Sequence, residues 1–226
     1  MPLNRGGELF FPLYLYKPSD AKKKDRGIQT MMLVEPEVAY DSKNRIPNIA
    51  KEVFQKFEKA FGRKPGPEEI FYYIYAILYS NIYREKYAEF LKIDFPRIPF
   101  TKEYKLFQHL AALGEELIQL HLLKHKSLSK PIAKFRGSGE DMIEKVAYDG
   151  KENVFINPKK YFEGIIPEVW NYQIGGYQVM EKFLKDRKGR HMTDAETYCR
   201  IATSIKFTID IQQEIDKFYE KAEKTA

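Results

Sequence analysis

PEEIFYYIYAILYSNIYREKYAEFL, residues 67–91, carries apolar or aromatic side chains around most of a helical circumference until Arg84. Pro67 at a first helical position, followed by Glu68 and Glu69, is typical of a helix N-terminus. A helix that is apolar on nearly every face must be surrounded by other elements. The stretch therefore predicts one long central helix, and its aromatic density favours core packing over a base-stacking platform.

Helical patterns continue on both sides of this stretch. Residues 48–61 place apolar side chains on one stripe before Gly62, and residues 101–123 repeat leucines at three- and four-residue spacing after Thr101, a suitable N-cap. A last helix is expected from Thr193 to about Lys224, with one apolar face. These patterns together predict a helical bundle.

The connection DFPRIPF, residues 94–100, holds one arginine between two prolines. Each proline disfavours a helical conformation in the residue before it, so the preceding helix must end here. We expect a rigid elbow between two helices. Arg97 either pairs with Asp94 or a helix C-terminus, or reaches a phosphate, and the local chemistry leaves both open.

The pattern changes after residue 127. MIEKVAYDGKENVFIN, residues 142–157, contains two short β-rich runs around Asp149-Gly150, which is a hairpin signal. Gly175-Gly176 precedes a short amphipathic pattern that ends at Gly189, and fits either a strand-to-helix turn or a backbone cradle for phosphate.

The predicted fold class is α+β, mainly α: a helical bundle, a small hairpin-containing α/β subdomain and a long C-terminal helix. Residues 1–45 are expected to form an N-terminal strand and an irregular linker, and residues 46–126 the bundle. Residues 127–226 are expected to form the hairpin-containing subdomain, whose long helix packs back on the bundle.

Composition excludes several classes of protein. The chain has 226 residues, 43% of them hydrophobic, and no apolar run approaches the ~18 residues of a membrane helix. The first residues lack the layout of a secretory signal. A single cysteine, Cys199, excludes an internal disulfide and an all-cysteine zinc site. We expect a soluble, cytoplasmic protein without a membrane partner.

Basic residues gather in three runs, at 17–26, 124–136 and 182–190, within a chain of net charge +6. Each run alone fits a solvated loop, and the runs at 124–136 and 182–190 also fit cations near a helix C-terminus. Three such runs favour a polyanionic partner. The residues that we expect to contact DNA are Lys124, Lys126, Lys130, Lys134, Arg136, Arg187, Lys188 and Arg190.

No pattern assembles a catalytic site. His121 and His125 have the i, i+4 spacing of a zinc pair, but Leu122 stands where a metalloprotease has glutamate. Cys199 lies in a helical pattern typical of a small buried side chain. Glycine-rich phosphate loops and nucleophile-elbow serines are absent from the sequence. A metal-dependent hydrolase that uses the two histidines is the weakest hypothesis.

Several motifs in succession carry a family resemblance: FPLYLY, RIPNI, residues 67–100, LHLL, YFEGI, VWNYQIGGYQV and KDRKGR. From about Leu9 to about Phe218, the chain resembles the C-terminal part of single-chain restriction–modification enzymes. The type ISP and related type IIG adenine-specific DNA methyltransferases are the most similar of these. The longest blocks are residues 67–100 and 169–190.

The resemblance implies a target recognition region that holds double-stranded DNA while an upstream methyltransferase domain acts. It implies S-adenosylmethionine as a cofactor of the parent enzyme and none in this fragment, which is not catalytic by itself. Asn157-Pro158-Lys159-Lys160 departs from the adenine-methylation tetrapeptide, since it lacks the second proline and the aromatic residue. The alternative is an interdomain docking or scaffold module of the same enzyme that contacts DNA little or not at all.

Overall fold

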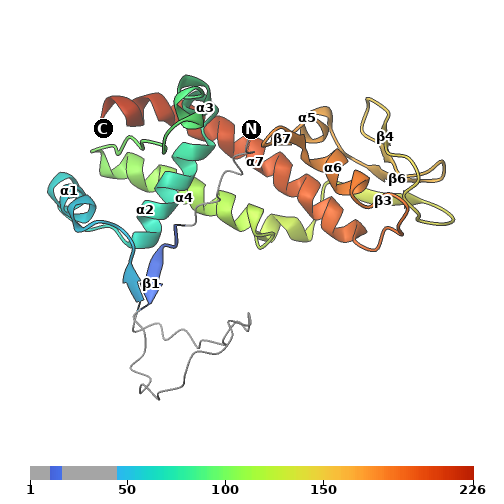
Figure 1. The fold of residues 1–226 in the computed structure, drawn as a ribbon, viewed down its shortest axis with the longest axis horizontal. Coiled ribbons are helices and arrows are strands. Elements are labelled where there is room, and N and C mark those ends of the chain that lie inside the picture. The colour runs from blue at the N-terminus through green and yellow to red at the C-terminus, as the bar shows by residue number, and fades with distance from the viewer. Residues whose placement is uncertain (1–10, 17–44) are drawn as a thin grey trace, which may run out of the picture. The chain divides into compact units, whose positions relative to one another are not determined.

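The computed structural model describes residues 11–16 and 45–226 (Figure 1). The chain divides into two compact units, Met1–Phe71 and Tyr72–Ala226. The basic run at 17–26 and most of the expected linker lie outside the described residues. Across the described ranges, every helix is too short or too polar to serve as a bilayer span.

The first unit contains a two-stranded antiparallel sheet and a helix. Strand β1 (Tyr14–Tyr16) pairs with β2 (Arg45–Pro47), and α1 (Lys51–Phe61) follows. The predicted strand and helix are thus confirmed. The Tyr14 hydroxyl donates a hydrogen bond to Glu68, which lies 3.7 Å from Arg45. Desolvation and this bond raise the pKa of Tyr14 to about 12.

The helix α2 (Pro67–Tyr79) runs from the first unit into the second. The second unit otherwise contains the following helices: α3 (Asn81–Lys86), η2 (Phe90–Lys92), α4 (Tyr104–His121), η3 (Lys126–Ser129), α5 (Pro167–Trp170), α6 (Val179–Lys185) and α7 (Ala195–Lys224). The predicted long C-terminal helix is therefore confirmed, to within two residues of its expected start.

The prediction of a single long helix for residues 67–91 is wrong, because the helix is interrupted at Ser80. Ser80 has an extended backbone, and its hydroxyl accepts a hydrogen bond from the Tyr83 N–H at 3.2 Å. The same hydroxyl donates to Asp216 of α7 at 2.7 Å, and the Asn81 side chain donates to Asp216 at 3.0 Å. Ser80 is thus the N-cap of a new helix, held by a carboxylate 136 residues away.

Helices α2 and α4 approach each other closely at Gly114. A Cβ atom built on Gly114 would lie 1.9 Å from the Tyr72 carbonyl oxygen. Next to this point, the rings of Tyr73 and Phe107 stack with their centroids 4.9 Å apart. Gly114 therefore permits backbone contact between the two helices, and the aromatic side chains fill the space beside it.

The elbow at residues 94–100 is anchored by two buried tyrosines. Tyr73 donates its hydroxyl hydrogen to the Pro99 carbonyl at 2.7 Å, and Tyr83 donates to the Arg97 carbonyl at 3.1 Å. The Arg97 guanidinium lies 3.8 Å from Asp94, and its side chain is 81% exposed. The expectation of a non-helical, anchored connection is confirmed.

Thr101 was expected to be the N-cap of the following helix, and this expectation is wrong, because α4 begins at Tyr104. Its hydroxyl accepts a hydrogen bond from the Glu103 N–H and shares another with Thr225 near the end of α7, at 2.6 Å. The threonine therefore joins the start of one helix to the end of another.

Four short strands form an antiparallel sheet in the order β3-β6-β5-β4: β3 (Lys134–Gly137), β6 (Lys160–Glu163), β5 (Val154–Phe155) and β4 (Ala147–Tyr148). The predicted hairpin is confirmed, with Ala147 opposite Phe155. Its loop is longer than a two-residue turn, because the Asp149 carboxylate accepts hydrogen bonds from three successive N–H groups, those of residues 151–153. Hydrogen bonds from Asn153 and these N–H groups lower the pKa of Asp149 to about 2.

Helix α7 runs along the second unit and packs against both its sheet-containing part and helices α3 and α4 (Figure 1). Near its start Tyr198, Ala202 and Ile205 join a buried cluster with side chains of the sheet, α5 and α6. Towards its end Ile215 and Tyr219 are fully buried where α7 contacts α3 and α4. The mainly α fold with small antiparallel sheets confirms the predicted fold class.

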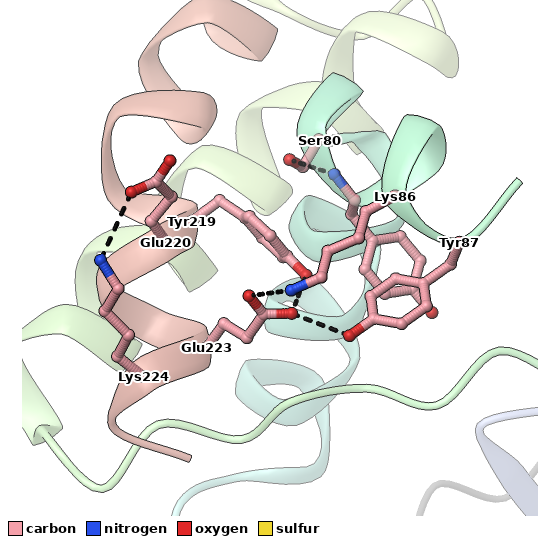
Figure 2. Close-up of polar contacts among 8 residues, drawn as sticks. Ser80, Lys86, Tyr87, Tyr219, Glu220, Glu223 and Lys224 are labelled. Carbon is pink, nitrogen blue, oxygen red and sulfur yellow. Dashed lines mark hydrogen bonds and ion pairs between the residues drawn. The ribbon is translucent and has the colours of Figure 1, made fainter.

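The last turn of α7 is fastened to α3 and the residue after it by Glu223 (Figure 2). Its carboxylate accepts hydrogen bonds from Lys86 at 2.7 Å, Tyr87 at 2.8 Å and Tyr219 at 3.0 Å. The bonds from Lys86 and the tyrosines lower the pKa of Glu223. Glu220, three residues earlier, pairs only with Lys224 among the described residues, at 3.5 Å.

We predict that Gly114→Ala lowers the free energy of unfolding by about 2 kcal/mol, because the methyl group forces α2 and α4 apart. Helix propensity alone predicts a gain of about 1 kcal/mol for this change. Urea unfolding measures the sign of the change in the free energy of unfolding. As a control, Ala112→Gly on the exposed side of α4 should cost only the propensity difference, about 1 kcal/mol. A stabilised Gly114→Ala variant would contradict the close approach.

We predict that Glu223→Gln lowers the free energy of unfolding by about 1–2 kcal/mol at neutral pH, through weaker hydrogen bonds. A carboxyl whose folded-state pKa lies below its unfolded value stabilises the fold above the unfolded pKa, and this stabilisation is lost as pH falls through the folded pKa. The difference from wild type should therefore shrink below the ordinary pKa of 4.5. Glu220→Gln, measured alongside, should change stability little at any pH.

Candidate nucleic-acid interface

The eight basic residues expected to contact DNA lie in two clusters of the second unit. Residues 124–136, the lysine loop, run from the end of α4 through η3 into β3. Residues 186–190, the basic turn, follow α6. The segment after β3 joins them, because Ile143 and the basic turn exchange two backbone hydrogen bonds: Ile143 N–H to Arg190, and Gly189 N–H to Ile143.

The lysine loop has a defined backbone. Leu123 adopts a left-handed conformation (φ 54°), and the N–H groups of Lys124 and His125 both donate to the Gln119 carbonyl. Arg200 of α7 donates to the Leu123 carbonyl at 2.5 Å. Leu128 is 2% exposed, so η3 is pinned to the core in the middle of the loop. The backbone of the loop is therefore held at its start and in its middle.

The four lysines of this loop expose their ammonium groups to solvent. All four are exposed, and none has an ion pair within residues 11–16 and 45–226: Lys124, Lys126, Lys130 and Lys134. Arg136 differs, because its Nε donates to Glu163 of the neighbouring strand at 3.0 Å. The loop thus presents four uncompensated positive charges and one that is paired.

The basic turn also contains residues of two kinds. Arg187 stacks its guanidinium over the Phe183 ring at 3.6 Å, donates to the Phe183 carbonyl at 3.0 Å, and lies 3.7 Å from Asp194. Lys188 and Arg190 are exposed and have no side-chain partner in the described part of the chain. Arg187 therefore shapes the turn, while Lys188 and Arg190 are available to a ligand.

The two histidines do not share a helix face, which corrects the zinc-pair geometry. Helix α4 ends at His121, whose ring nitrogens lie 2.8 Å from the Tyr75 hydroxyl and 3.0 Å from that of Thr208. Burial lowers the pKa of His121. His125 instead accepts from the Ser127 N–H as the cap of η3. The described residues include no group of three or more His, Cys, Asp or Glu that could hold a metal.

Two residues considered for catalysis, Cys199 and Asn157, have structural surroundings. Burial raises the pKa of the Cys199 thiol to about 11, which disfavours a thiolate. Asn157 donates its amide hydrogens to the Glu140 and Met142 carbonyls and accepts from two backbone N–H groups. An amide used in this way is not available to hold a flipped adenine.

A surface feature that the basic clusters do not include is the β7–β8 ribbon, formed by β7 (Gln173–Ile174) and β8 (Tyr177–Gln178). Gly175-Gly176 is its two-residue turn, so the glycines form a hairpin, and β8 separates them from the start of α6 at Val179. A glycine pair between two strand-forming residues is itself a hairpin signal. The ribbon and α6 enclose an open cleft of about 420 Å³.

The chain belongs to the Type ISP C-terminal specificity domain family, whose profile matches residues 2–215. No curated protein matches the chain.

Three solved structures are similar to the chain. The DrdV–DNA complex has 25% sequence identity and a TM-score of 0.61, over 76% of this chain and 20% of that one. LlaBIII, an ATP-dependent Type ISP restriction–modification enzyme bound to DNA, has 18% identity and a TM-score of 0.62, over 90% and 13%. A nuclease-deletion mutant of the Type ISP enzyme LlaGI, in complex with a DNA substrate mimic, has 21% identity and a TM-score of 0.50, over 79% and 17%. The chain spans a fifth or less of each of these proteins.

We predict that Arg187→Ala lowers the free energy of unfolding by about 1–2 kcal/mol, because it removes a cation–π contact and a charged hydrogen bond. Lys188→Ala should change stability by less than about 0.5 kcal/mol, as a solvated surface substitution. Thermal unfolding of the two single variants makes the comparison. Equal effects would contradict the division of the turn into a structural and an available part.

Proposed function

We propose that this chain is a DNA-binding target recognition module that has no catalytic activity of its own. The observation that supports the proposal is the lysine loop, whose ordered backbone carries four exposed lysines that have no ion partner among the described residues. Solvated ammonium groups on a fixed surface suit the phosphates of a duplex, whose contacts release counterions. The DNA-bound state of the similar DrdV structure supports the same partner.

The two basic clusters have different roles under this proposal. The lysines at 124, 126, 130 and 134, with Lys188 and Arg190, contact phosphates and set orientation without reading sequence. Arg136 can exchange Glu163 for a phosphate at small cost, since an exposed ion pair stabilises a protein by at most about 1 kcal/mol. Arg187 stabilises the conformation of the basic turn through its contacts with Phe183.

The proposal extends to the parent enzyme. In it, an upstream methyltransferase domain carries S-adenosylmethionine and performs adenine methylation, while this module places the duplex. The exposed Ile93, just before the elbow, and Phe95, within it, are 83% and 58% accessible and favour a second role in docking against that domain. Large apolar side chains on an anchored loop are typical of a protein contact.

The test is binding of a fluorescently labelled duplex of mixed sequence to the purified chain, measured by anisotropy over a salt series. We predict binding at low salt that weakens steeply as salt is added. Replacing the four unpaired lysines with alanine (Lys124, Lys126, Lys130 and Lys134) should make the slope of log K against log salt less steep by roughly 3–4, about 0.9 for each lost phosphate contact.

The matched control removes four lysines that are ion-paired on α7: Lys206, Lys217, Lys221 and Lys224. This variant has the same net charge as the first, so a general charge effect would alter both slopes equally. The control slope should stay close to that of wild type. Absence of binding by the wild-type chain at low salt would overturn the proposal.

A further inference from the structure

The β7–β8 ribbon ends in an exposed two-residue glycine turn, Gly175-Gly176. Gly175 and Gly176 have φ angles of 57° and 81°, the left-handed values that a two-residue hairpin turn requires. A Cβ built on either glycine would find no atom within 4 Å. The tip is therefore narrow, and each glycine has open space on the side where a Cβ would stand.

The ribbon exposes an apolar pair next to this tip. Ile174 and Tyr177 are cross-strand partners, so they share one face of the ribbon. Their exposed fractions are 54% and 64%. Core packing cannot be the reason for apolar side chains that remain this exposed, and their position at a projecting tip is typical of a contact surface.

The base of the ribbon is fixed to the core. The Val179 N–H donates to the Tyr172 carbonyl at 3.1 Å, and the Gln178 side chain donates to the Trp170 carbonyl at 2.5 Å. Trp170 is 8% exposed and stacks on Tyr148 at 5.0 Å. A projecting tip on a fixed base presents its side chains in a defined direction.

Cations lie beside the ribbon across the cleft. The Lys182 ammonium lies 5.4 Å from the centre of the Tyr177 ring, and Lys185 is a second lysine in the cleft lining. Their ion pairs, with Asp186 and Glu181, are about half exposed, so the lysines can turn to a phosphate at small cost. An apolar tip flanked by lysines matches the bases and backbone of a duplex better than it matches an apolar protein surface.

We propose that the β7–β8 ribbon enters the major groove of DNA and that Ile174 and Tyr177 contact base edges there. The inference rests on the proposed function, and it names the element that reads sequence. The major groove is about 12 Å wide and admits a two-stranded ribbon, whose strands lie about 4.8 Å apart. An apolar side chain suits the thymine methyl group, and the tyrosine hydroxyl can bond to base acceptors.

The experiment selects duplexes with a randomised central segment on the immobilised chain and sequences those retained. The wild-type chain should enrich a motif. Ile174→Ser/Tyr177→Ser should lose preference at adjacent positions of that motif by about tenfold or more, the effect of losing base contacts. Its salt slope and its thermal midpoint should match those of wild type, because the two side chains contact neither phosphate nor core.

The control variant is Ile93→Ser/Phe95→Ser, which removes two other exposed apolar side chains, one in the elbow and one just before it, and should keep the whole motif. An unchanged motif in the ribbon variant would overturn the inference and assign the ribbon to a protein contact. Wild-type binding without any enrichment would also overturn it, while phosphate binding would stand. Absence of binding at low salt would remove the proposed function together with the inference.

Discussion

The carboxylate of Asp216 determines how the aromatic centre of the second unit folds. It accepts from Ser80 and Asn81, and so ends α2 at a point where the sequence could continue as a helix. The chain then turns, which brings Tyr83 within reach of the Arg97 carbonyl in the elbow. The elbow leads into α4, and the end of α4 carries the lysine loop. One partly buried contact of α7 thus lies at the start of the path that leads to the lysine loop.

Periodicity was sufficient to predict where helices form, because the apolar stripes of α1, α4 and α7 repeat at helical spacing over eleven or more residues. It was insufficient for the break at Ser80, since neighbouring residues favour a helix and the competing partner lies 136 positions away. Thr101 failed in the same way: a good local cap is used for a contact with Thr225. Long-range polar partners are not visible in a window of residues.

The sequence locates the basic residues of the candidate site, but it does not show which of them are paired. A count of basic residues treats Arg187 and Lys188 alike, yet one stacks on Phe183 and the other is solvated. Spacing likewise placed His121 and His125 on one helix, which ends at the first of them. The ribbon could have been found, because Gly175-Gly176 between alternating residues is a hairpin signal, but its exposure depends on tertiary packing.

The exposed ribbon tip and the buried scaffold place different constraints on amino-acid substitutions in this chain. Substitutions at Ile174 or Tyr177 change a surface without disturbing the buried cluster around Trp170. Mutations there leave the stability of the fold unchanged, whereas a change at Gly114 or Ser80 destabilises it. New side chains can therefore accumulate on the tip while the scaffold stays constant. A module built in this way can diverge in what it contacts faster than in how it folds.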